Sequence, residues 1–157
     1  MSAQRPAIEI RAADFSVDEE VAALYAAAPD AGACVIFTGR VRAQGTIGAL
    51  SGLELEHYPG MTEESIAAVL DEARARWKPL ALRVVHRVGW LPVGAQIVFL
   101  GVASAHRAEA FAAAEFVMDY LKTRAPIWKK ELGAGGAHWV ESRARDADAA
   151  ARWENGR

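Results

Sequence analysis

The chain has 157 residues and a mass of 16.9 kDa, which is the size of a single domain. Charged residues make up 24% of it, and 18 basic against 20 acidic side chains leave a net charge of −2. This balance argues against a nucleic-acid-binding protein that depends on overall positive charge. The longest apolar run, Ile97–Ala103, is too short for a membrane span or a signal peptide. We therefore expect a soluble, cytoplasmic protein with one domain over residues 1–157.

The first half of the chain mixes short strands and helices. Ser16 and Glu19 form a capping box that predicts a helix start, and β-branched, aromatic or alternating residues mark the strands. The predicted elements, in order, are a strand at Ile8–Arg11, a helix from Ser16 to about Ala28, a strand within Gly32–Val41, a mobile loop at Gln44–Gly48, a strand at Leu53–Tyr58 and a helix capped by Thr62.

The second half predicts a central strand followed by a long helix. Ile97–Val102 lacks polar alternation, as strands covered on both faces do, and Pro126 prevents the long helix from continuing. The predicted elements are strands at Leu82–Val88 and Ala95–Ser104, a helix from about Ala105 to Ala125, an edge strand at His138–Glu141 and a helix at Arg145–Trp153. Strands and helices do not alternate strictly, so we predict an α+β fold.

Cysteine and histidine usage gives little support to a metal site. The single cysteine, Cys34, lies inside a hydrophobic strand, where it is expected to be an inert core residue. The four histidines are far apart along the chain and form none of the short ligand spacings of zinc sites.

Ser104-Ala105-His106-Arg107 stands where an apolar strand passes into the long helix. Unpaired N–H groups and the positive end of the helix dipole favour an anion there. His106 and Arg107 would repel that dipole unless an anion neutralised them, which predicts a phosphate or carboxylate site. The alternative is that Arg107 simply pairs with Glu109 or Glu115.

Two lysines flank the end of the long helix. Lys122 shares a helical stripe with Met118, and Pro126 turns the chain so that Lys129 can approach Lys122. Two close, partly buried lysines lower one another's pKa, which suits an acid, a base or a nucleophile. The alternative is a surface pair of Lys122 with Asp119 followed by a solvated charged run.

Arg40 and Arg42 follow a buried strand and lie on one face by alternation. Their guanidinium groups could bind phosphate in bidentate fashion. They could equally be edge charges that discourage aggregation.

Five segments together resemble, in this order, the family of large catalytic subunits of molybdopterin synthase. The likeness extends from about Phe15 to Trp153. The segments are Phe37–Arg42, Leu55–Thr62, Ser104–Arg107, Met118–Glu131 and Trp139–Glu141.

The resemblance implies an α/β-hammerhead-type fold with a mixed and antiparallel sheet and a small additional β subdomain. It implies a homodimer that binds a small sulfur-carrier subunit on each protomer, giving a heterotetramer. The carrier's C-terminal Gly-Gly ends as a thiocarboxylate, which donates sulfur to cyclic pyranopterin monophosphate to form the dithiolene of molybdopterin. No metal and no cofactor are implied.

The resemblance also implies roles for individual residues. Lys122 is the principal catalytic residue and Lys129 supports it. In this family the pockets lie near the dimer interface, so His106 and Arg107 are candidates for the neighbouring protomer's site. The substrate-binding residues implied are Arg40, Val41, Arg42, His106, Arg107, Lys130 and Glu131.

Two other functions fit the residues. A non-catalytic module could present the pterin phosphate or the carrier tail to another enzyme. A nucleic-acid-binding surface over Lys122–Lys130 would show affinity that falls steeply with salt.

Overall fold

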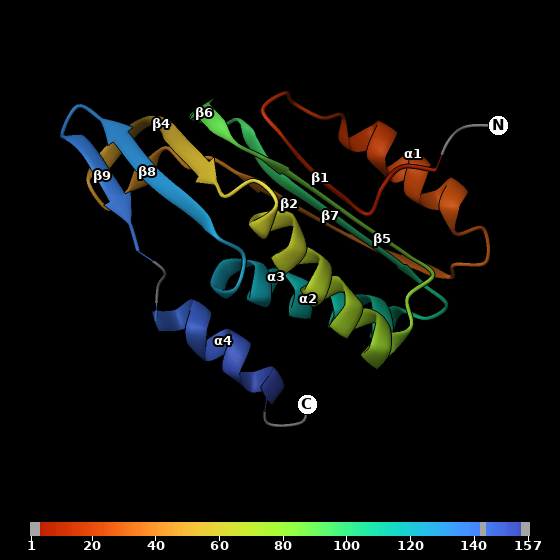
Figure 1. Ribbon diagram of the computed structural model, residues 1–157. Helices are drawn as coiled ribbons and strands as arrows, with labels where there is room; N and C mark the ends of the chain where they lie inside the picture. Colours follow the sequence, from red (N-terminus) through yellow and green to blue (C-terminus); the bar gives the residue numbers. More distant parts are fainter. Residues whose placement is uncertain (1–3, 142–143, 155–157) are drawn as a thin grey trace.

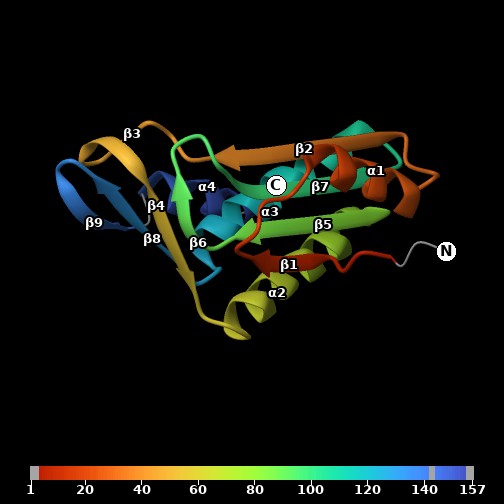
Figure 2. The same cartoon turned by 90° about the horizontal axis from the view of Figure 1, so that it is seen from above.

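The computed structural model describes residues 4–141 and 144–154, which form two β-sheets and four helices (Figures 1 and 2). The strands are β1 (Ile8–Arg11), β2 (Ala33–Arg40), β3 (Gln44–Gly45), β4 (Gly48–His57), β5 (Ala81–Arg87), β6 (Gly89–Pro92), β7 (Gln96–Ser104), β8 (Ile127–Gly133) and β9 (Gly136–Val140). The helices are α1 (Val17–Ala27), α2 (Met61–Trp77), α3 (Arg107–Thr123) and α4 (Ala144–Glu154). No helix in these ranges is long and apolar enough to cross a membrane.

The four-stranded sheet has the order β1-β5-β7-β2 and carries the main core. β1 pairs with β5 in parallel, whereas β5–β7 and β7–β2 are antiparallel. β7 is central, and its residues from Val98 onward are buried, which confirms the prediction from its unbroken apolar run. The α+β class is likewise confirmed, while the finer description as an α/β-hammerhead remains a prediction.

Helices cover both faces of the four-stranded sheet. Val84 and Leu100 point to α2 and α3, and Phe99 points to the opposite face with α1. Figure 1 shows α1 on one side of the sheet and the other helices on the other. Ile66, Val69 and Leu70 of α2 are fully buried.

The five-stranded sheet packs at one end of the four-stranded one (Figure 2). Its strand order is β3-β4-β8-β9, and β6 pairs with β4. One face closes over a small core of Val41, Leu53, Leu55 and Leu91. β3 and β4 follow β2 in the chain and β8 follows α3, so this sheet is connected to the ends of both β2 and α3.

The sequence predicts no strand where β8 lies, and local structure differs from the predictions at three further places. Gln44–Gly48 was predicted to be a loop, but β3 pairs there with β4, and β6 occupies the expected connection after Val88. Thr62 does not cap α2, because the helix begins after Gly60, which has a φ of 87°. The differences at β3 and β6 arise because these strands are too short to show a pattern of their own and form by pairing with β4.

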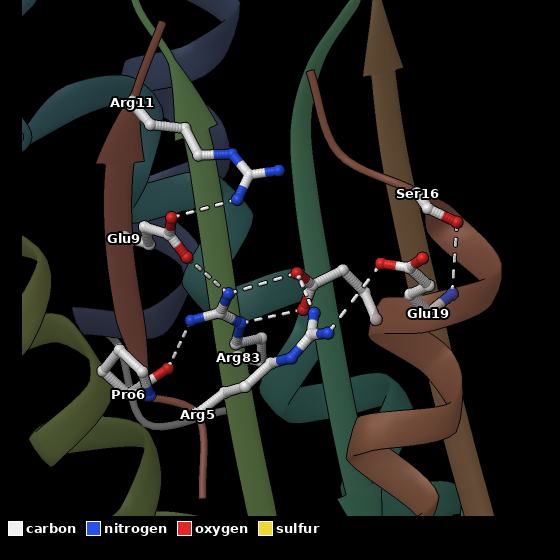
Figure 3. A pocket seen from close by; sticks show the side chains of 8 residues that line it. Arg5, Pro6, Glu9, Arg11, Ser16, Glu19 and Arg83 are labelled. Carbon is white, nitrogen blue, oxygen red and sulfur yellow. Dashed lines mark hydrogen bonds and ion pairs between the residues drawn. The ribbon is translucent and has the colours of Figure 1, made fainter. Parts of the chain in front are cut away.

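A buried ion network ties β1 and α1 to β5 (Figure 3). The Arg83 guanidinium donates to Glu20 Oε2 at 2.9 Å and to Glu9 Oε2 at 2.6 Å. Arg5 donates to Glu20 Oε1 at 2.7 Å. Because Arg83 and Glu20 are 5% and 1% exposed, each needs the other as a partner.

Candidate active site

The candidate site lies at the end of the four-stranded sheet where β7 begins, here called the β7-start end. Arg40 of β2 pairs with Gln96 of β7, and His86 of β5 pairs with Val98. α3 follows β7, packs against it and runs back along it, so its last turn with Lys122 returns to the same end (Figure 1). β8, which carries Lys129, begins only a few residues after α3 ends.

Both lysines act on His86, a half-buried histidine at the end of β5. Burial, with the positive charges of Lys122, Lys129 and His57, lowers the pKa of His86 to about 4. Such charge effects weaken with distance, so both lysines belong to the surroundings of His86. The close approach of Lys129 to Lys122 stays a prediction. Lys122 is nevertheless exposed, whereas Lys129 is half-buried.

Buried Thr62 anchors the turn between the two lysines. Its hydroxyl donates to the carbonyl of Pro126 at 2.9 Å and accepts from the Tyr58 N–H at 3.0 Å. Thr62 is fully buried, so these bonds join the start of α2 to the connection between α3 and β8. Thr62 of α2 therefore holds the turn that sets the spacing of Lys122 and Lys129.

The neighbours of Lys129 on β8 are arranged differently from expectation. Alternation turns Lys130 to the opposite face, where its Nζ lies 5.4 Å from the Trp139 ring centre. Glu131 is 4% exposed, and its carboxylate accepts the Thr46 N–H at 2.9 Å. The Glu131 carboxylate thus holds the β3–β4 turn.

The segment from Arg40 to Arg42 is only partly available to a ligand. Arg40 donates through Nε and Nη2 to the Gly94 carbonyl at 3.1 and 3.0 Å. Val41 is 3% exposed, and both its peptide groups bond to the turn before β7. The structure therefore gives Arg40 and Val41 structural contacts, and their substrate contacts stay a prediction. Arg40 and Arg42 are both exposed, and Arg42 lies beyond the end of β2.

His106 and Arg107 lie at the other end of α3 from Lys122. Both are exposed, and the 17-residue helix separates them from the lysines by about 25 Å. His106 is the N-cap residue and makes no side-chain capping bond. A single chain therefore does not bring the predicted anion site together with the lysine pair.

Cys34 and the histidines offer no alternative chemistry at the site. Burial raises the pKa of the Cys34 thiol, and Cys34 pairs with Ala103, far from the lysines. In residues 4–141 and 144–154 no group of three histidine, cysteine or acidic side chains could hold a metal ion.

The prediction from sequence missed His86 and the role of Thr62. The available signal was a histidine directly after the apolar pair Val84-Val85 in the predicted strand Leu82–Val88, because histidine is fully buried less often than apolar residues are. Nothing local indicated that Thr62 contacts Pro126, because the two residues are far apart in sequence.

Comparison with known proteins decides the family. The family model described as MoaE protein matches residues 10–124. The molybdopterin synthase catalytic subunit of Vibrio cholerae is 52% identical over 147 residues, which is 94% of this chain and 97% of that protein. The chain belongs to the MoaE family.

Solved structures of MoaE proteins agree with this assignment. The molybdopterin biosynthesis MoaE protein from Burkholderia ambifaria superposes with a TM-score of 0.82 at 46% identity, covering 96% of this chain and 99% of that one. The molybdopterin synthase from Staphylococcus aureus gives 0.79 at 30% identity, covering 87% and 98%. As a MoaE protein, the chain is a catalytic subunit of molybdopterin synthase, a sulfur-transferring enzyme of molybdopterin biosynthesis.

Proposed function

We propose that sulfur transfer takes place at the β7-start end of the four-stranded sheet, with Lys122 as the principal catalytic residue and Lys129 in support. The observation that carries this proposal is that the last turn of α3, with Lys122, and the start of β8, with Lys129, flank the connection at Pro126, whose carbonyl accepts a hydrogen bond from Thr62. A chain with a net charge of −2 thus concentrates positive charge at one place.

The reactants explain why this charge is needed. Cyclic pyranopterin monophosphate is an anion, and so is the thiocarboxylate at the carrier's C-terminus, so the two repel each other. Lys122, Lys129 and exposed Arg42 would offset this repulsion and stabilise the oxyanion that forms during transfer. The sulfur comes from outside the chain, because burial raises the pKa of Cys34, its only cysteine, and keeps the thiol protonated.

The partners we propose are a small sulfur-carrier subunit and a second copy of this chain, in a cytoplasmic heterotetramer. An extended Gly-Gly tail would enter the positive region beside β8. His106 and Arg107 are too far along α3 to reach the lysines of their own chain. We therefore assign them to the substrate phosphate in the neighbouring protomer's pocket.

The remaining predicted residues surround this pocket in our proposal. Arg40 and Val41 fix the turn before β7, and Glu131 fixes the β3–β4 turn. Lys130 lies behind Lys129 on the opposite face of β8. These four side chains shape the walls of the site, and their substitution should affect activity less than loss of Lys122.

Reconstitution with purified components tests the function. The protein is mixed with thiocarboxylated carrier and cyclic pyranopterin monophosphate, and dithiolene formation is measured. Product formed without a third protein supports catalysis by this chain. Binding of carrier and substrate without product would favour the non-catalytic presenting module instead.

A further inference from the structure

His86 occupies a place in the site that the lysine roles leave open. It lies on the same face of β5 as Val84, the face covered by α2 and α3, at the end where α3 stops. The start of β8 reaches the same end, because Ile127 pairs with His57 of β4 and packs with Ile97 of β7 against one core cluster. The charges of Lys122, Lys129 and His57 accordingly act on His86 there. Glu63 Oε1 lies 3.8 Å from Nε2 of His57 on the outer side of this cluster.

The hydrogen bond at Nδ1 fixes the chemical state of the His86 ring. Nδ1 lies 2.8 Å from the carbonyl oxygen of Arg87. A carbonyl oxygen only accepts, so Nδ1 carries the proton. A neutral ring protonated at Nδ1 has its lone pair at Nε2, and the ring stays neutral at pH 7 because its pKa lies near 4.

We propose that His86 is a positioning residue whose Nε2 accepts a hydrogen bond from an ammonium group of the lysine pair and holds it toward the substrate. This inference deepens the proposed function and rests on it. Lysine has three donors and a flexible stem, so a fixed acceptor on a strand reduces the freedom of the ammonium group. A neutral acceptor does this without cancelling the positive charge that the anionic reactants need.

Three substitutions separate the acceptor from the ring's other contacts. H86Q places an amide oxygen near the Nε2 position, H86N retains a polar group only near Nδ1, and H86F removes both. Thermal unfolding of each variant checks that the fold is intact. We expect kcat for dithiolene formation to fall about 10- to 100-fold in H86N and H86F, with H86Q retaining most of it and KM for the carrier little changed.

A spectroscopic measurement tests the proposal without using activity. Nitrogen-15 NMR of the imidazole should show a neutral ring protonated at Nδ1 at pH 7, with titration near pH 4. K122A should move this titration to higher pH, because one positive charge near the ring is lost.

The outcomes distinguish this proposal from the proposed function. Equal activity of H86N and H86Q, or wild-type activity of H86F, would overturn the role of Nε2. A ring protonated at Nε2 would also overturn it. If wild-type protein makes no product while the NMR results hold, the failure lies with the proposed function and His86 still belongs to the lysine cluster.

Discussion

Replacing Thr62 by valine tests whether the turn between the lysines is held by this hydroxyl. The substitution keeps the side-chain shape and removes the bonds to Pro126 at 2.9 Å and from Tyr58 at 3.0 Å. Each bond contributes about 1–1.5 kcal/mol, since both backbone partners are only part-buried and water can replace some of the loss. T62V should therefore lower the free energy of unfolding by about 2–3 kcal/mol.

The matched control is T62S, which keeps the hydroxyl and loses one methyl group, at a cost of about 1 kcal/mol. Urea unfolding gives both free energies, and dithiolene formation is measured well below the melting temperature. T62V should lose activity that T62S retains, because only T62V frees the connection between Lys122 and Lys129. Equal stability and equal activity of the two variants would refute this account of the turn.

Two further substitutions test structural contacts away from the lysines. E20Q removes the charge that faces buried Arg83 and should lower the free energy of unfolding in urea by about 3 kcal/mol. Burial alone would raise the pKa of Glu20, but Arg83 and Arg5 outweigh this effect and lower the pKa. The stability that depends on this ionised carboxylate is lost as pH falls below about 4.5. E20Q should therefore lose less free energy of unfolding in acid than wild type does, and an equal loss would contradict the network. G45A would bring a Cβ against Glu131 Oε2, so the carboxylate must leave the Thr46 N–H. We expect the free energy of unfolding to fall by about 1–2 kcal/mol, and an unchanged thermal melt would argue against this contact.

Most of the fold could be predicted because its signals are local. The capping box at Ser16 is present, with its hydroxyl accepting the Glu19 N–H at 3.3 Å. The apolar stripe of α2 is buried, and β7 is central. β3 and β6 could not be predicted, because two- and four-residue strands exist only through pairing with β4.

The site could be predicted only in part, for a related reason. Pro126 correctly indicated that the chain turns between Lys122 and Lys129. The helix predicted from about Ala105 to Ala125 already implies the separation of about 25 Å between His106 and Lys122 that α3 shows. The contribution of His86 arises from strands and a helix that meet only in three dimensions.

The most direct test of the central claim is the rate of dithiolene formation by K122A in the reconstituted system. The control is K78A, which removes an exposed lysine at the end of α2. We predict that K122A binds the carrier and unfolds like wild type but forms no dithiolene, that K129A is impaired less, and that K78A is unaffected. Near-wild-type turnover by K122A would contradict the account.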